Sequence, residues 1–163
     1  MKAHPDALAL DAQVCFPLYA ASHLIQRLYW PLLDPLGLTY PQYLVMLVLW
    51  ERDGVTVSDV GERLLLESGT LSPLLRRLEA SGLVMKAAHA EDGRVVVLRL
   101  TAKGRRLRER ARGVPEALLC RMLAGRRPDA AALEQVVALR AQLKALVAGL
   151  QRATEVLPEE RTA

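Results

Sequence analysis

The sequence predicts a mostly α-helical fold with one small β-hairpin. Hydrophobic residues make up 52% of the 163 residues and aromatic residues only 4%, so the core must consist mainly of Leu, Val and Ala, a composition that favours helices. Apolar residues recur at helical spacing along most of the chain. Residues 84–100 differ, because valines and leucines that favour extended structure follow a turn-like AEDG sequence. The length suits one domain, or one small module with appended helices.

The first helix is expected from about Pro17 to Leu32, where apolar residues follow helical spacing. Pro17 suits the first turn of a helix, where its missing N–H costs nothing. The prolines and the glycine of PLLDPLGLTY then end the pattern. Two further helices are expected within residues 39–51 and 56–65, because each segment opens with a Thr that is followed three residues later by a Gln or Asp able to cap the helix in return.

The next helix is expected from about Gly69 to Gly82 and is amphipathic. Its apolar face has the spacing i, i+3, i+4 and i+7 and consists of Leu71, Leu74, Leu75 and Leu78. Its outer face has hydroxyls near the N-terminus and guanidinium groups further along, from Ser68, Thr70, Ser72, Arg76 and Arg77. Such a face can bind DNA, although an ordinary solvated surface has the same pattern.

A two-stranded hairpin is expected from about Val84 to Leu100, with its tip at residues 92–94. A basic helix then begins at Thr101, and Pro115 kinks or divides it. AGRRPD is a loop, and the final residues of the chain are expected to fray. Between the two lies a last helix whose apolar stripe needs a partner surface, formed by Leu133, Val136, Val137, Leu143, Leu146, Val147 and Leu150.

Positive charge is concentrated in the middle of the chain. The formal net charge is +4, and residues 51–112 hold 13 Lys and Arg against 9 Asp and Glu, whereas the rest of the chain holds 9 of each. A basic segment between neutral helices indicates a module that binds a polyanion. Charge alone leaves a solvated surface without a partner equally open.

Several function classes are disfavoured. No signal peptide is expected, since Pro5, Asp6 and Asp11 break the N-terminal segment, and no apolar run approaches the roughly 18 residues that span a membrane. We therefore expect a cytoplasmic protein without a membrane partner, whose two cysteines are thiols rather than a disulfide scaffold. The three histidines lack metal-ligand spacing and there is no Gly-rich phosphate loop, so neither a metal nor another cofactor is expected.

The order of elements predicts a winged helix-turn-helix: a short helix, a turn, a second helix with a polar and basic outer face, and a basic hairpin. In that fold the second helix enters the major groove of DNA, where Ser and Thr contact bases or phosphates and Arg can bind guanine through two hydrogen bonds. Arg94 at the hairpin tip can reach the DNA backbone or the minor groove, and Lys86 on the hairpin is also assigned to DNA binding.

The segment LTYPQYLVMLVLWERDGVTVSDVGERLLLESGTLSPLLRRLEASGLV, followed by EDGR and LTAKG, resembles the MarR-type winged-helix transcription regulators over roughly residues 38–112. Within that family, QVCFPLYAA, LTYPQYLVMLVLWE and ESGTLSPLLRRLE resemble the organic hydroperoxide resistance regulators of the two-cysteine type. The resemblance implies a homodimeric repressor that binds a pseudo-palindromic DNA operator and is released when organic hydroperoxide oxidises a cysteine. We accordingly expect an N-terminal sensing and dimerisation segment (1–36), a DNA-binding domain (37–104) and C-terminal dimerisation helices (105–163).

The resemblance also assigns roles to individual residues. Cys15 corresponds to the peroxide-sensing cysteine of the family. Tyr29 and Tyr40 correspond to the tyrosines that hydrogen-bond its thiolate from the partner subunit. Cys120 lies where two-cysteine members keep a resolving cysteine, which implies a disulfide between Cys15 and Cys120 of the other subunit.

The hairpin tip departs from the family pattern at one position. Asp92 and Arg94 correspond to the ends of an acidic-acidic-Arg signature, but Gly93 replaces the usual Glu between them. We expect Asp92 and Arg94 to form an ion pair that braces the tip, and Gly93 to loosen it.

The residues alone leave the role of the cysteines open. A free cysteine in an apolar stretch is usually buried and inert, and Cys15 and Cys120 both lie in such stretches. A helix that begins near Pro17 would instead put Cys15 close to its N-cap, where the helix dipole favours a thiolate. Two alternatives therefore remain: a MarR-type regulator with inert cysteines that a small apolar or phenolic ligand releases, and a thiol peroxidase. A peroxidase needs an activating Arg or His that the sequence does not reveal, and a DNA-binding module is superfluous to it, so no enzyme is expected.

Overall fold

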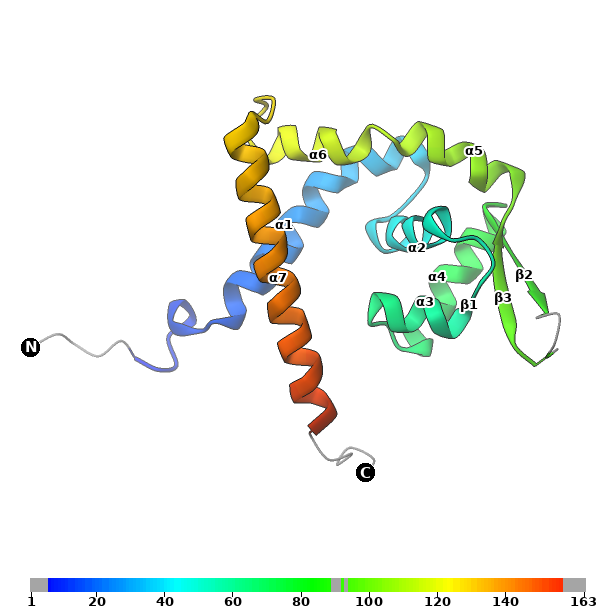
Figure 1. Cartoon of the computed structure of the whole chain (residues 1–163), viewed down its shortest axis with the longest axis horizontal. Coiled ribbons are helices and arrows are strands. Elements are labelled where there is room, and N and C mark those ends of the chain that lie inside the picture. The colour runs from blue at the N-terminus through cyan, green and yellow to red at the C-terminus, as the bar shows by residue number, and fades with distance from the viewer. Residues whose placement is uncertain (1–5, 89–91, 93, 157–163) are drawn as a thin grey trace, which may run out of the picture. The chain divides into compact units, whose positions relative to one another are not determined.

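The computed structural model describes residues 6–88, 92 and 94–156, and the chain divides into two compact units, Met1–Leu118 and Leu119–Ala163. The helices in chain order are η1 (Leu10–Ala12), α1 (Cys15–Leu33), η2 (Asp34–Leu36), α2 (Tyr40–Glu51), α3 (Val57–Leu64), α4 (Ser68–Ala80), α5 (Ala102–Ala111), α6 (Val114–Met122) and α7 (Ala130–Val156). The mostly helical fold predicted from the sequence is confirmed (Figure 1).

The threonine caps form as predicted. The Thr39 N–H donates to Gln42 Oε1 at 2.8 Å at the start of α2. At the start of α3 the exchange is reciprocal, because the Thr56 N–H donates to Asp59 Oδ2 at 3.0 Å and the Asp59 N–H donates to Thr56 Oγ1 at 3.0 Å. These bonds satisfy backbone donors that the first turn of a helix leaves free, so each helix begins where the sequence predicts.

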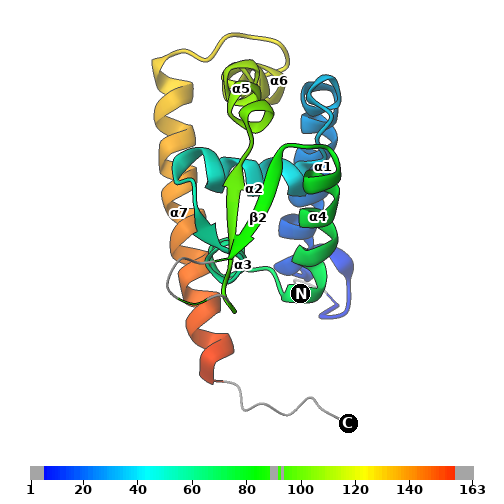
Figure 2. The same cartoon turned by 90° about the vertical axis from the view of Figure 1, so that its right-hand side faces the viewer.

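The wing is part of a three-stranded antiparallel sheet in the order β1-β3-β2. Strands β2 (Val84–Ala88) and β3 (Val96–Leu100) form the predicted hairpin. Strand β1 (Val55–Thr56) pairs with the other edge of β3 and was not predicted, because two residues are too few to show an alternating pattern. Figure 2 shows α5 at one end of these strands and α3 at the other.

Helix α2 is the centre of the first unit and contacts α1, α3, α4, α5 and β3. Most of its residues are buried, including Tyr43, Met46 and Leu49. The indole N–H of Trp50, at its C-terminal end, donates to the Gly104 carbonyl at 2.9 Å. Gly104 itself permits a close approach of α5 to the base of the wing, since a Cβ built there would lie 2.1 Å from the Leu83 carbonyl oxygen.

The predicted basic helix from Thr101 is divided, as Pro115 suggested. Helix α5 ends at Ala111, and α6 begins at Val114 with Pro115 in its first turn, where proline is tolerated. Thr101 caps α5 by accepting a hydrogen bond from the Gly104 N–H at 3.0 Å.

The second unit consists mainly of α7. Asp129 caps this helix by accepting a hydrogen bond from the Ala132 N–H at 2.8 Å. None of the described α7 residues is buried, and the stripe residues Leu133, Val137 and Leu150 are 45%, 54% and 53% exposed. The predicted apolar stripe is therefore present and lacks a cover within the single chain.

Candidate DNA-reading surface and thiol site

The outer face of α4 is available for DNA contact. Leu71, Leu75 and Leu78 are buried against the core, and the residues predicted to read DNA are all exposed: Ser68, Thr70, Ser72, Arg76 and Arg77. The helix begins at Ser68, one residue before the predicted start at Gly69, which makes Pro73 its sixth residue. Pro73 has no N–H for the Gly69 carbonyl, and this carbonyl lies at an exposed position that water can reach.

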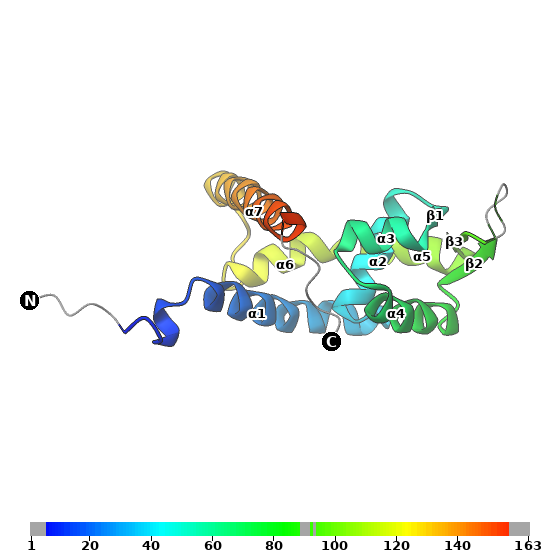
Figure 3. The ribbon, with the colours of Figure 1, turned by 90° about the horizontal axis from the view of Figure 1, so that it is seen from below.

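The turn between α3 and α4 fixes the angle at which α4 is presented. Leu65 adopts a left-handed conformation with φ of 54°, and the Leu66 N–H donates to the Gly61 carbonyl at 2.9 Å. A Cβ on Gly61 would lie 3.0 Å from the Leu66 carbonyl oxygen, so the backbone passes close to α3 here. Figure 3 looks onto this side of the unit, where α3 and α4 lie next to each other.

The α3 cap also has an electrostatic consequence. Hydrogen bonds from the backbone and side chain of Thr56 lower the pKa of the Asp59 carboxyl below its usual value. The carboxylate is therefore charged near the N-terminus of α3, where the helix dipole favours a negative charge.

Arg76 and Arg77 are unengaged cations. Neither guanidinium group makes an ion pair or a hydrogen bond to any other described residue, whereas Arg105 Nη1 lies 3.0 Å from Asp53 Oδ2 and Arg63 pairs with Glu51. Guanidinium groups on the reading helix thus stay available for phosphates or guanine bases.

The wing tip is braced as expected. Arg94 Nε lies 3.2 Å from Asp92 Oδ1, and the same oxygen accepts a hydrogen bond from the Arg94 N–H at 3.0 Å. The Arg94 side chain is 93% exposed and keeps guanidinium donors for a DNA backbone. Lys86, also predicted to bind DNA, lies 3.5 Å from Glu79 of α4. Gly93, which is expected to loosen the tip, lies outside the described residues.

Cys15 lies at the first residue of α1 and is exposed. The helix was expected to begin near Pro17, so the thiol is on its first turn rather than just before it. Val14, at the N-cap, provides no side-chain hydrogen bond to the helix end. The thiol is therefore accessible in the single chain, and the expectation that a cysteine in an apolar stretch is buried does not hold for Cys15 there.

Tyr29 and Tyr40 come together, and sequence reasoning missed a third member of their cluster. The Tyr29 ring centroid lies 4.7 Å from that of Tyr40 and 5.7 Å from that of Tyr43. Burial, with smaller effects from Tyr40 and Tyr43, raises the pKa of Tyr29 to about 12. Burial likewise raises the pKa values of Tyr40 and Tyr43, so all three hydroxyls are neutral hydrogen-bond donors at physiological pH. Tyr43 is one helical turn after Tyr40, a spacing that could have identified it.

Cys15 cannot reach this cluster within its own chain. Cys15 and Tyr29 are both on α1, and 14 residues of helix separate them by about 21 Å. A contact between the thiol and the tyrosine hydroxyls therefore requires a second copy of the chain.

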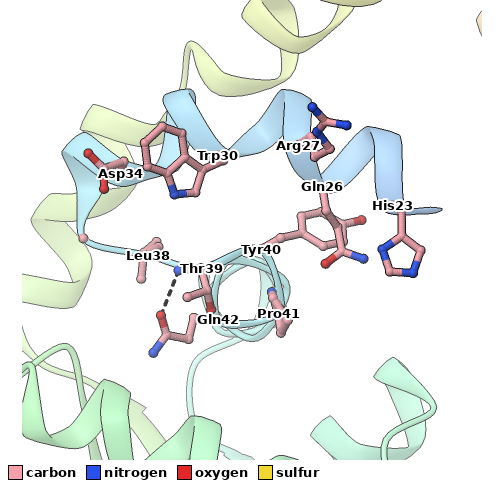
Figure 4. A pocket seen from close by; sticks show the side chains of 11 residues that line it. His23, Gln26, Arg27, Trp30, Asp34, Leu38, Thr39, Tyr40, Pro41 and Gln42 are labelled. Carbon is pink, nitrogen blue, oxygen red and sulfur yellow. Dashed lines mark hydrogen bonds between the residues drawn. The ribbon is translucent and has the colours of Figure 1, made fainter. Parts of the chain in front are cut away.

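A cavity of about 540 Å³ lies beside Tyr40, between α1 and the start of α2 (Figure 4). His23, Gln26 and Tyr40 are grouped on one side, and Trp30 and Asp34 lie further along α1. Trp30 is 68% exposed, which is unusual for so large an apolar side chain. No sequence motif indicated this cavity, because its lining comes from two helices and the turn between them.

Cys120 is half-buried on α6, near the end of that helix. Its carbonyl accepts a hydrogen bond from the Gly125 N–H at 2.8 Å, which closes the helix C-terminus. Cys120 belongs to the second compact unit and Cys15 to the first.

Among residues 6–88, 92 and 94–156, no group of three or more His, Cys, Asp and Glu side chains could hold a metal ion. Within the same residues no single helix is long and apolar enough to cross a membrane, and only a pair bent by 68°, Cys15–Leu36 with Tyr40–Glu51, passes that test.

Comparison with known proteins identifies regulators of transcription. Residues 27–110 match the family described as transcriptional regulator SarA/Rot. The organic hydroperoxide resistance transcriptional regulator of Bacillus subtilis (strain 168) is 46% identical over 114 residues, which are 70% of this chain and 78% of that protein. The HTH-type transcriptional regulator TtmR of Methylorubrum extorquens (strain PA1) is 51% identical over 113 residues, 69% of this chain but only 58% of TtmR.

Solved structures agree with the winged-helix assignment. Reduced AbfR bound to DNA has a TM-score of 0.69 and 33% identity, and the match covers 86% of this chain and 94% of AbfR. AbfR of Staphylococcus epidermidis with its disulfide formed has a TM-score of 0.60 and 34% identity, and the match covers 88% of this chain and 92% of that one.

Proposed function

This chain belongs to the winged-helix transcriptional regulators of the MarR and SarA type, and we propose that it is a homodimeric repressor that organic hydroperoxide releases from DNA. The observation that carries the proposal is an exposed thiol at the N-terminus of α1 together with a cluster of neutral tyrosines, whose α1 member Tyr29 lies about 21 Å further along the same helix. Two copies related by a two-fold axis bring each thiol to the other copy's tyrosines.

The DNA-binding half of the proposal rests on α4 and the wing. Ser68, Thr70 and Ser72 are exposed in the N-terminal part of α4, the part that reaches base edges in helix-turn-helix proteins. Arg76 and Arg77 follow, to contact phosphates or guanine, and Arg94 extends from the wing toward the backbone. A dimer carries two such surfaces, so a pseudo-palindromic operator with half-sites about one helical turn apart is expected.

The dimer is supported by two apolar surfaces that the single chain leaves open. The α7 stripe is exposed, as described above, and Leu8, Leu10 and Val14 before α1 are 90%, 58% and 86% exposed. Exposed apolar surfaces of this kind mark protein interfaces. We therefore assign residues 1–36 and 105–163 to dimerisation and sensing, and residues 37–104 to DNA binding.

Reciprocal contacts of this kind predict where the two α1 helices approach each other. If Cys15 of each copy lies at Tyr29 of the other, two straight helices must come closest at the midpoint between these positions, which is residue 22. Cys15, Ser22 and Tyr29 follow at intervals of seven residues and so share one face of the helix. Ser22 is small and exposed, which permits the close approach.

The chemistry proceeds in two balanced steps. The Cys15 thiolate attacks the distal oxygen of the hydroperoxide, the O–O bond breaks, and the thiolate becomes a sulfenic acid while the alkoxide takes up a proton and leaves as an alcohol. The Cys120 thiol of the other subunit then attacks the sulfenic sulfur, which forms the disulfide and releases water. Before the first step, the neutral Tyr29 and Tyr40 hydroxyls donate hydrogen bonds to the thiolate. Oxidation removes the thiolate as their acceptor, and this change alters the contact between the subunits.

A non-reducing gel tests the proposal. Wild-type protein, Cys15→Ser and Cys120→Ser are compared before and after a stoichiometric amount of organic hydroperoxide. A band at twice the monomer mass that a reductant removes, present only in wild type, supports the intersubunit disulfide. Monomeric wild type with an unmodified Cys15 thiol by mass spectrometry contradicts it.

A second function is favoured by one observation, the cavity of about 540 Å³ beside Tyr40. Its volume is within the range of small-molecule sites, so a regulator released by a small apolar or phenolic ligand is the alternative. Cys15→Ser separates the two functions, because this variant abolishes release by peroxide and leaves release by a ligand unchanged.

A further inference from the structure

Three cations converge on a second cavity that the proposed repressor function does not use. This cavity, of about 380 Å³, is lined by Leu36, Gly37, Ser81, Leu83, Lys103, Arg106, Leu107 and Arg110. Lys103, Arg106 and Arg110 are spaced i, i+3 and i+7 on α5 and therefore share one face of that helix. No acidic side chain is among the described residues that line it.

Two of the cations are held in place by backbone carbonyls. Lys103 Nζ donates to the Ser81 carbonyl at 2.8 Å, and Arg110 Nη2 donates to the Pro35 carbonyl at 2.7 Å. The Arg106 guanidinium makes no hydrogen bond or ion pair to another described residue, although Arg105 on the same helix and Arg112 just after it are paired with Asp53 and Glu109. Among the residues that the structure describes, no carboxylate lines this cavity or pairs with its three cations, and a bound anion would stabilise such an arrangement.

The floor of the cavity is apolar and well ordered by packing. Leu83 and Leu107 are 3% and 5% exposed. A site with a buried apolar floor and converging cations suits a molecule that has both an apolar body and an anionic group. A phosphate group fits the cations, because it presents three acceptor oxygens to Lys and Arg donors.

The cavity lies away from the surface that reads DNA. Leu83 and Lys103 flank the end of the sheet where Val84 pairs with Leu100, and the wing tip lies beyond the opposite end, about 16 Å along β2. Figure 1 shows α5 at the upper end of β2 and β3. DNA phosphates that contact α4 and the wing do not account for these cations.

We propose that the cavity lined by Lys103, Arg106 and Arg110 binds a small phosphorylated molecule. The ligand joins three segments of the first unit, namely the turn between α1 and α2, the end of α4 and helix α5. Its binding therefore stabilises the folded unit. The site does not depend on the thiol chemistry, so the two proposals fail independently.

The test uses phenyl phosphate as the probe, with inorganic phosphate and phenol as its two halves, at constant ionic strength. We compare the full-length wild type with Arg106→Gln and with Arg108→Gln, a matched control that removes the same charge from an exposed position on α5 outside this cavity. We expect phenyl phosphate, at about ten times its dissociation constant, to raise the Tm of wild type and Arg108→Gln by about 3 °C. In Arg106→Gln the shift is lost.

The Tm shift caused by inorganic phosphate supports the proposal if this shift is also lost in Arg106→Gln. In wild type, the shift with inorganic phosphate can be equal to or smaller than the shift with phenyl phosphate. The proposal is overturned if wild type shows no shift, if Arg106→Gln and wild type shift equally, or if phenol alone matches phenyl phosphate. It is also overturned if Arg106→Gln weakens DNA binding and reduces its salt dependence, because the cations then contact the DNA backbone instead.

Discussion

Gly104→Ala tests the contact by which α5 is held against the base of the wing. A Cβ at residue 104 would lie 2.1 Å from the Leu83 carbonyl oxygen, whereas carbon–oxygen contacts ordinarily begin at about 3.3 Å. The backbone must therefore open by about 1.2 Å, at a site where Leu83 also accepts a hydrogen bond from the Thr101 N–H at 3.1 Å. Overpacking of this kind costs about 3 kcal/mol, and loss of the bond from Trp50 to the Gly104 carbonyl costs about 1 kcal/mol more.

Helix propensity acts in the opposite direction, since Ala is favoured over Gly within a helix by about 1 kcal/mol. We therefore expect Gly104→Ala to lower the free energy of unfolding by about 2–4 kcal/mol. Urea unfolding followed by circular dichroism measures this, at one protein concentration because the stability of a dimer depends on it. Gly69→Ala is the control, with nothing within 4 Å of its Cβ, and is expected to be neutral or to stabilise by up to about 1 kcal/mol. A Gly104→Ala protein as stable as wild type would refute the reasoning.

Three further predictions follow from the site. Arg76→Gln should weaken binding to a DNA duplex of arbitrary sequence and lower the slope of log K against log salt concentration by about 0.9, as fluorescence anisotropy can measure; an unchanged slope means that Arg76 does not contact a phosphate. In a background without native cysteines, Ser22→Cys should be cross-linked between subunits by a short bis-maleimide, whereas Arg27→Cys should not. The two copies of residue 27 are about 15 Å further apart along the helices than the two copies of residue 22. Efficient cross-linking of both variants contradicts the antiparallel approach. Tyr29 has its pKa raised from 10.0 to about 12, so the folded state keeps a proton that the unfolded state loses. Stability should therefore be complete below pH 10 and fall between pH 10 and 12, and the fall should be smaller in Tyr29→Phe, measured by chemical denaturation at each pH.

Local signals in the sequence were sufficient for most of the helices. The pairs Thr39–Gln42 and Thr56–Asp59 predict the starts of α2 and α3, and both exchange the expected hydrogen bonds. Such signals are reliable because donor and acceptor lie within four residues of each other. The start of α1 was predicted two residues late, because Val14 at its N-cap has no capping side chain to mark the boundary.

Features made by distant segments were missed. Strand β1 is only two residues long and exists because Val55 pairs with Leu98, 43 residues away. The cavity beside Tyr40 and the cation-lined cavity on α5 are likewise assembled from helices and turns that are separate in sequence. Tyr43 was overlooked as a member of the tyrosine cluster, because its burial depends on the fold of α1 onto α2. Periodicity indicates which face of a helix is apolar, but not which surface covers it.

A continuous set of contacts joins the tyrosine cluster to the wing. The Tyr29 ring contacts the rings of Tyr40 and Tyr43. The Tyr43 ring centroid lies 6.1 Å from that of Trp50 in an edge-to-face arrangement, and the Trp50 indole N–H donates to the Gly104 carbonyl. Gly104 in turn lies against Leu83, the residue before β2. Because each contact in this series is packed or hydrogen-bonded, a shift of the tyrosines has a direct mechanical route to the base of the wing.

Spatial continuity does not by itself establish coupling, which must be measured as a free energy. Trp50→Phe keeps most of the ring packing and removes only the N–H donor to the Gly104 carbonyl. If the route carries the signal, the reduced variant should bind DNA about as tightly as wild type, while the ratio of DNA dissociation constants between oxidised and reduced protein should fall by several fold. An unchanged ratio would mean that the contact between Trp50 and Gly104 does not carry the proposed redox signal.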